Sequence, residues 1–212
     1  MSSDPPEVSR GSVNPQYEKL FREIEAKFKA SSIPTEKWYL TALGAILPSS
    51  EPYMAGQLYL YLLSEPAYST PDERKAITIR FKEVILKAVA LLGIPKPAEA
   101  IASIEQVDGE ELPFSREGWQ CDEANHQRGV SWLQKMYAQN MPALLDLFKR
   151  HRDFGSAVCD IAYGLCLSDR QILDDVDTEI VVLPAVMSQN LPRMTYWHVK
   201  GCRRAGISKE DV

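Results

Sequence analysis

The chain has 212 residues, 45% of them hydrophobic and 25% charged, and its net charge is −5. Such proportions are typical of a soluble globular protein with one sizeable core, or two halves that share an interface. The acidic balance argues against nucleic acid as a partner, because no surplus of basic side chains is present to neutralise phosphates. No apolar run reaches the roughly 18 residues of a membrane span, and the polar N-terminus does not resemble a signal peptide. We therefore expect a cytoplasmic protein with no membrane contact.

Residues 1–13 are polar and rich in Pro and Ser, which predicts a disordered leader before a single domain over 14–212. The clearest helix of that domain follows Thr70, since Glu73 completes a capping box. The stretch "VDGEELPF", which starts at residue 107, is the candidate linker between two halves. Apolar residues at helical spacing predict helices at about 15–28, 35–47, 51–63, 70–92, 97–106, 116–138, 142–151, 154–167, 176–189 and 192–205.

No stretch alternates polar and apolar residues over the length of a strand, so the sequence predicts an all-α fold, a bundle of about ten helices. Two segments of it are similar, "EVILKAVALLGIPKPAEAIASI" (83–104) and "EIVVLPAVMSQNLPRMTYWHVKG" (179–201). Each has a Glu, an apolar helix, a turn with Pro and a second helix. Two related hairpins, in a weak repeat at 70–106 and a second half at 116–212, would bury each other's apolar faces. Chance is the alternative, because apolar helices resemble one another easily.

Glu179 and His198 lie on the two helices of the second hairpin. Glu179 is about ten residues before the turn and His198 about six after it, so their depths along antiparallel helices differ by about 6 Å. A carboxylate that contacts an imidazole fixes its tautomer and stabilises its cationic form, an arrangement that is common in general acid–base catalysis. The alternative is structural: Glu179 suits the positive end of a helix, and His198 is a packed core residue.

The segment "DTEIVVLPAVMSQNLPRMTYWHVKGCRRAGISKEDV" resembles the signature hairpin of the carboxymuconolactone decarboxylase and alkylhydroperoxidase D superfamily (AhpD-like). An acidic residue that opens an apolar helix, the interval to the histidine, "WH", Gly201 and "AGIS" carry the resemblance. "RGVSWLQKMY" and "AYGLCLSDRQILDDVDTE" are similar to the lead-in of decarboxylase-like members. The resemblance implies the family's all-α fold, catalytic roles for Glu179 and His198, and a homo-oligomer.

The chain departs from the peroxidase branch of that family at Leu191 and Met194, which stand where that branch has Cys-x-x-Cys. Without this pair of thiols, peroxide reduction by that route is not available. Cys202 follows His198 by one helical turn, and a buried apolar thiol is the expectation there. The four cysteines, at 121, 159, 166 and 202, show no zinc spacing, and we expect reduced thiols, no metal site and no cofactor.

Three further residues are candidates for substrate binding. Arg193 precedes His198 at the turn, where its guanidinium could hold a substrate carboxylate, although a surface Arg is common at a helix start. Trp197 is the neighbour of His198. His126 shares a helix face with Trp119, Asp122 and Glu123 in the predicted helix 116–138, and pairing of His126 with Asp122 is the structural alternative.

Three functions are consistent with these patterns. The first is a cofactor-free enzyme that uses Glu179 and His198 for decarboxylation, isomerisation or a related lyase step on a small carboxylated lactone or polyketide-like acid. The second is a non-catalytic helical protein that kept the fold, and the third, least favoured, is a thiol peroxidase. The apolar helices at 54–63 and 81–92 predict a homo-oligomer, a trimer or dimer, with Trp38, Tyr59 or Tyr61 in its interface.

Overall fold

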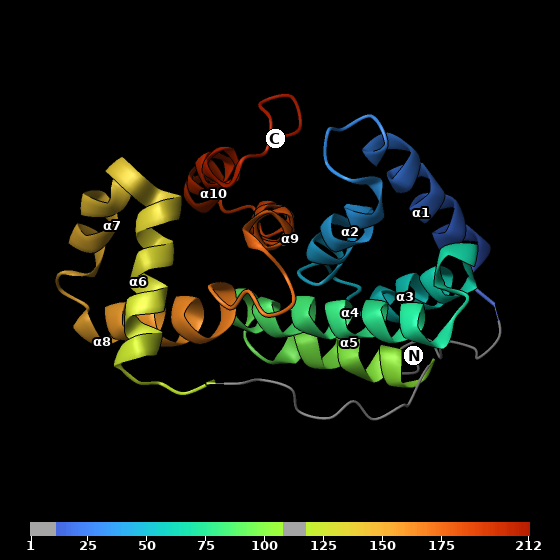
Figure 1. Ribbon diagram of the computed structural model, residues 1–212, viewed down its shortest axis with the longest axis horizontal. Coiled ribbons are helices and arrows are strands. Elements are labelled where there is room, and N and C mark those ends of the chain that lie inside the picture. Colours follow the sequence, from blue (N-terminus) through green and yellow to red (C-terminus); the bar gives the residue numbers. More distant parts are fainter. Residues whose placement is uncertain (1–11, 108–117) are drawn as a thin grey trace.

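The computed structural model describes residues 12–107 and 118–212, and within these ranges every regular element is a helix (Figure 1). The predicted all-α fold is thereby confirmed for this part of the chain. The first half holds α1 (Pro15–Phe28), η1 (Thr35–Lys37), α2 (Trp38–Ile46), α3 (Met54–Ser64), η2 (Pro66–Tyr68), α4 (Pro71–Leu92) and α5 (Pro95–Glu105). The second holds α6 (Glu123–Tyr137), η3 (Ala138–Asn140), α7 (Met141–Phe148), α8 (Arg152–Ser156), η4 (Ala157–Leu167), α9 (Asp175–Ser188) and α10 (Pro192–Ala205).

Caps set the ends of the helices that matter most for the site. The Thr70 hydroxyl accepts from the backbone N–H of Glu73 and the Glu73 carboxylate accepts in return, so α4 starts with the predicted capping box. The Asp174 carboxylate caps α9 by accepting from the N–H of Asp177. At the far end of α10, Gly206 has φ +108°, a left-handed conformation that favours glycine.

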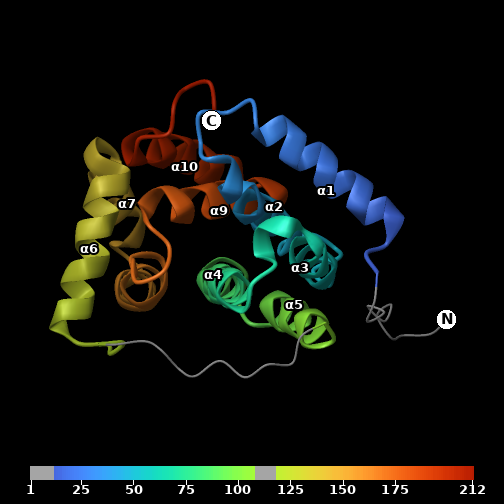
Figure 2. The same cartoon turned by 45° about the vertical axis from the view of Figure 1, so that its right-hand side comes forward.

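Two helical hairpins, α4–α5 and α9–α10, occupy the middle of the molecule (Figures 1 and 2). Each hairpin packs its second helix against a helix of its own half, α5 against α3 and α10 against α6. Each places its first helix against the other half, since α4 contacts η4 and α9 contacts α2. The two halves therefore bury each other's apolar surfaces, as the similar segments predict, while their origin by duplication stays a prediction.

The apolar core continues from the first half into α9. At the crossing of α2 and α9, a Cβ on Gly44 would lie 2.5 Å from the carbonyl oxygen of Val181, so only glycine lets these helices approach so closely. Trp38, Tyr59 and Tyr61 are buried in this core, within their own subunit. The prediction that they form an oligomer interface is therefore wrong, because the halves already cover them. No helix of the described ranges is long and apolar enough to cross a bilayer.

Several predicted boundaries differ from the structure. The leader was expected to reach residue 13, but Val13 packs against the core; residues 1–11, and 108–117 with most of the candidate linker, lie outside the described ranges. The helix expected at 116–138 begins only at Glu123, because the Asp122 side chain accepts from the N–H of Asn125 and so precedes the helix as its cap. The helix expected at 142–151 ends at Phe148.

The segment expected as one helix at 154–167 is a short α8 followed by the π-helix η4. Side chains from α6 and from the segment before it bond to its carbonyl groups: Asn125 Nδ2 donates to Asp160 O at 2.7 Å, and Trp119 Nε1 to Leu165 O at 2.8 Å. The buried Lys87 ammonium of α4 donates to the carbonyls of Cys166, Leu167 and Asp169 at 3.0, 3.1 and 2.8 Å. Partners distant in sequence thus support the wider helix, which its own sequence does not reveal.

Candidate active site

Glu179 and His198 face each other across the α9–α10 hairpin. The Nδ1 atom of His198 lies 3.2 Å from Oε2 of Glu179, so the contact expected from their spacing is present. Glu179 is 0% exposed and His198 is 4% exposed. A buried carboxylate beside Nδ1 favours the tautomer with the proton on Nδ1 and stabilises the imidazolium when it forms. The catalytic role of the pair stays a prediction.

Gly201 on α10 gives the Glu179 carboxylate its space. A Cβ at this position would lie 2.8 Å from Glu179 Oε2, closer than side-chain carbons approach an oxygen without a shift. The thiol of Cys202 also approaches this carboxylate, with Sγ 3.7 Å from Oε2. Burial and the charge of Glu179 raise the pKa of the Cys202 thiol far above its ordinary value. Cys202 is therefore a protonated core thiol at neutral pH, as expected from the sequence, and is unsuited to peroxide chemistry.

Two atoms of the pair have hydrogen-bonding capacity to spare. Within residues 12–107 and 118–212, Oε1 of Glu179 is buried without a hydrogen-bond partner. In the same ranges, the His198 side chain makes one hydrogen bond, from Nδ1 to Glu179, so its Nε2 atom has no protein partner. An unpartnered carboxylate oxygen in the interior costs free energy, and such groups are concentrated where a protein binds or transforms a ligand.

Tyr137 and Tyr163 form an aromatic wall next to His198. The Tyr137 ring meets the rings of His198 and Trp197 edge-on, at centroid distances of 6.3 and 5.4 Å. Its hydroxyl lies 2.9 Å from that of Tyr163. Burial, together with the charge of Glu179, raises the pKa of Tyr137 to about 12 and that of Tyr163 well above its ordinary value. Sequence reasoning missed both tyrosines, although "QKMY" and "AYGL" lie inside the segments that resemble the family.

The candidate substrate-binding residues are only partly gathered at this site. Trp197 is half-buried against Tyr137, next to His198. Arg193 is exposed in the first turn of α10. His126 pairs through Nδ1 with Asp160 of η4 at 2.5 Å, so the alternative of a bond to Asp122 is wrong.

The helix face expected to join His126 with Trp119, Asp122 and Glu123 does not exist as predicted. Trp119 and Asp122 precede α6, and Asp122 is its cap. Trp119 instead donates to η4 and lines a surface hollow with Arg128, Ser168, Asp169, Arg170 and Gln171.

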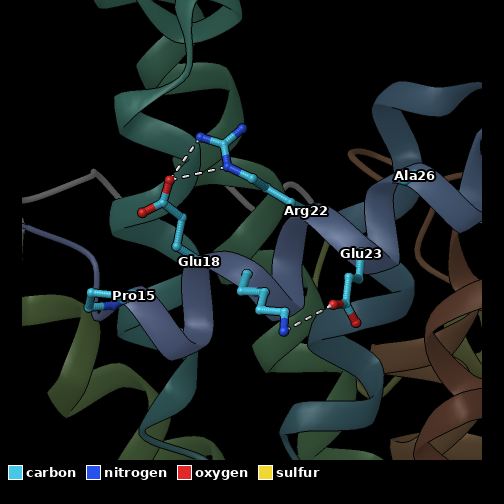
Figure 3. Close-up of a pocket in the computed structure, with 6 residues that line it drawn as sticks. Pro15, Glu18, Arg22, Glu23 and Ala26 are labelled. Carbon is cyan, nitrogen blue, oxygen red and sulfur yellow. Dashed lines mark hydrogen bonds and ion pairs between the residues drawn. The ribbon is translucent and has the colours of Figure 1, made fainter.

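Two other surface hollows of the described chain lie away from Glu179 and His198. Figure 3 shows one of them, which is formed by side chains of α1 alone, with the ion pairs Glu18–Arg22 and Lys19–Glu23 along the helix. The other is lined by residues 149–154. A hollow on one helix holds a ligand poorly, because it buries little of the ligand's surface.

Comparison with known proteins adds one distant relative. No family model matches the chain, and no solved structure matches it. Peroxisomal protein 2 of Schizosaccharomyces pombe is 24% identical over 173 residues, which span 73% of this chain and 80% of that protein. Identity at this level does not show a family, and the name describes the relative alone.

Proposed function

We propose that the chain is a cofactor-independent acid–base enzyme with an alkylhydroperoxidase D-like fold, of the carboxymuconolactone decarboxylase kind. Its substrate is a small carboxylated lactone or polyketide-like acid. The observation that supports this proposal most is the buried contact between His198 and Glu179, in which Nε2 and Oε1 have no partner among the described residues. Such a pair offers an acid and a base at fixed positions in a site of low dielectric constant.

In a decarboxylation, the bond from the carboxylate carbon to the α-carbon breaks and carbon dioxide leaves. The electron pair remains on the substrate as an enolate. His198 as imidazolium donates the Nε2 proton to the α-carbon, and Glu179 stabilises the imidazolium through Nδ1. The next proton from solvent restores the imidazolium. Isomerisation uses the same residues, with His198 removing and returning one proton.

The test is turnover of a panel of β-keto acids and carboxylated lactones, 4-carboxymuconolactone among them, followed by release of carbon dioxide and by NMR. We expect His198→Ala to lower the rate by about 10²–10⁴-fold, the usual contribution of a general acid or base. Glu179→Gln should lower it less. His151→Ala is the control, because His151 is exposed before α8 and is not a candidate site residue. Undiminished turnover in His198→Ala, or none with wild type on any compound, would contradict the proposal.

A second candidate function is a non-catalytic helical protein that retained this fold. The observation that favours it is the burial of His198 and Glu179, which are 4% and 0% exposed, so a substrate needs a local opening to reach them. This candidate predicts that wild type turns over none of the compounds. It also predicts that His198→Phe, which fills the same space, leaves the cellular role of the protein intact.

The proposal extends to assembly and location. We propose a homo-oligomer, dimer or trimer, that acts on a small acid without nucleic acid or membrane as partner. We further propose a cytoplasmic location; the name of the fission-yeast relative gives the peroxisome as the rival location. Imaging of a fluorescent fusion beside markers of both compartments distinguishes the two.

A further inference from the structure

The buried pair of tyrosines has more donors than its contact uses. Tyr137 is 4% exposed and Tyr163 is 9% exposed, and their hydroxyl oxygens are 2.9 Å apart. Two hydroxyl groups carry two protons, and a single hydrogen bond between them uses one. Within the described chain, neither hydroxyl has another hydrogen-bond partner. One O–H donor is therefore left over in the interior, where a polar group without a partner is costly.

One member of the tyrosine pair packs against the proposed acid–base pair. The Tyr137 ring packs edge-on to the imidazole of His198. Burial raises the pKa of both tyrosines, and the charge of the Glu179 carboxylate, which is 0% exposed, adds to the rise. The raised pKa values keep both protons on the hydroxyls at neutral pH, so the tyrosines act as donors and not as bases. One donor of the tyrosine pair and one acceptor, Oε1 of Glu179, thus have unused capacity, and Tyr137 and Glu179 both contact the imidazole of His198.

We propose that the Tyr137–Tyr163 pair binds the carbonyl oxygen of the substrate and stabilises the enolate oxygen that forms there. The substrate is accordingly a small enolisable carbonyl compound, which deepens the proposed function and rests on it. As negative charge develops on the oxygen, the O–H donor of one tyrosine shortens its hydrogen bond, and the second tyrosine supports it by donating to the first. Both protons stay on the tyrosines, while the proton that moves to carbon comes from His198.

The probe is the enolate of 1,3-cyclohexanedione, which places a charged oxygen on a small ring. Its binding to the full-length protein is measured by calorimetry and by NMR at neutral pH. Wild type should bind it better than 2,2-dimethyl-1,3-cyclohexanedione, which has the same carbonyl groups without the enolate charge. Tyr137→Phe and Tyr163→Phe keep the rings in place, and each should weaken binding about 10- to 100-fold, as expected for a hydrogen bond to a charged oxygen. Tyr196→Phe on α10 is the matched control, because Tyr196 is exposed and should not change binding.

His198→Ala separates this inference from the proposed function. If both hold, His198→Ala still binds the enolate while turnover of the panel is lost. Loss of turnover in His198→Ala with unchanged binding in both Phe variants would overturn the role of the tyrosines alone. Enolate binding that depends on the tyrosines, together with full turnover in His198→Ala, would overturn the acid–base role of His198 alone. No enolate binding by wild type, or equal binding of the uncharged diketone, would also overturn the inference.

Discussion

Gly201 fits the Glu179 carboxylate against α10, and the site depends on this small residue as much as on its charged ones. Because Gly201 has no side chain, the carboxylate extends into the space that a side chain would fill. A Cβ at this position would lie only 2.8 Å from Oε2. Because Glu179 is buried, its carboxylate cannot move out into water without taking part of α9 with it. Small size at position 201 is therefore a condition of the contact between Glu179 and His198.

We predict that Gly201→Ala breaks this contact. The added methyl group displaces the carboxylate, and we expect a loss of about 1–3 kcal/mol in the free energy of unfolding, the usual cost of overpacking. Urea denaturation measures that loss, and the NMR shift of the His198 ring reports the contact itself. In the Glu179→Ala background the clash is absent, so adding Gly201→Ala there should cost much less. Equal costs in both backgrounds would show that the methyl group meets something other than Glu179.

At the scale of the element, η4 is held from outside. Lys87 donates to two of its carbonyls, those of Cys166 and Leu167, and to the carbonyl of Asp169 just beyond its end. Its ammonium also lies 3.5 Å from the Glu83 carboxylate, and both side chains are buried. Glu83 stands in the first hairpin where Glu179 stands in the second, and its basic neighbour is a lysine on its own helix instead of a histidine across the hairpin. The first of the two similar hairpins is thus used for structure.

We predict that Lys87→Met lowers the free energy of unfolding at pH 7 by about 3–5 kcal/mol, since it leaves Glu83 and three carbonyls without their cation. Urea denaturation measures the loss. Lys75→Met is the control, because Lys75 is exposed on the same helix, and it should change little. A loss of stability equal to that of the control would contradict the structural role of Lys87.

The difference in stability between wild type and Lys87→Met should depend on pH, and the pKa of Lys87 gives the direction. Burial lowers the pKa of Lys87 to about 8 from 10.5 in the unfolded chain, although Asp169 opposes the shift. Between these values the unfolded chain binds more protons, so the stability of wild type relative to Lys87→Met rises with pH, by at most about 3 kcal/mol. Unfolding curves of both proteins from pH 7.5 to 10.5 test this; a difference that falls with pH would contradict it.

Sequence patterns predicted those elements whose determinants are local. Thr70, Glu73 and Gly206 lie at helix ends that the structure reproduces, because a cap depends on a few neighbouring residues. The contact of Glu179 with His198 followed from their distances to one turn. The π-helix was not predictable in this way, since its carbonyls bond to side chains as distant in sequence as Lys87. The tyrosine pair joins positions 26 apart on two different helices, which no local pattern reveals. Asp122 was misplaced because an acidic residue suits both a cap and a first turn.

At the scale of the whole molecule, Asp177 connects both halves. Its carboxylate lies 2.7 Å from Nζ of Lys37 and 3.0 Å from Nη2 of Arg80. The Nε atom of Arg80 also donates to the hydroxyl of Tyr39. The contacts link η1, α4 and α9 at one buried carboxylate. We predict that Asp177→Asn lowers the free energy of unfolding by about 2 kcal/mol, less than for a fully buried pair, because both cations can regain water.

Asp174→Asn is the matched control for that substitution. Asp174 is mostly exposed, and asparagine caps a helix as well as aspartate does, so the control should shift the urea midpoint very little. Equal effects of both substitutions would indicate general loss of charge at the start of α9, and not loss of the buried contacts.

We predict that the protein in solution is a closed homo-oligomer, dimer or trimer. Its interface lies on apolar side chains that the subunit leaves exposed, since the three aromatic residues first expected there are buried. Two groups of such side chains are present: Met187, Leu191 and Tyr196 near the α9–α10 turn, and Leu145, Phe154 and Ile161 on α7, α8 and η4. Light scattering at micromolar concentration measures the mass, and a value near the 23.9 kDa of one chain would contradict this prediction.

The long-range contacts of the chain have a consequence for how fast it folds. Lys87 bonds to residues 79 to 82 positions away, and the Asp211 carboxylate accepts from Ser32, 179 positions away. Each such contact requires a large loop of chain to close first, and loop closure slows folding. Although all its described elements are helices, we expect this protein to fold more slowly than a simple helical bundle. Because Ser32 and Asp211 are 179 positions apart, we expect their contact to form last.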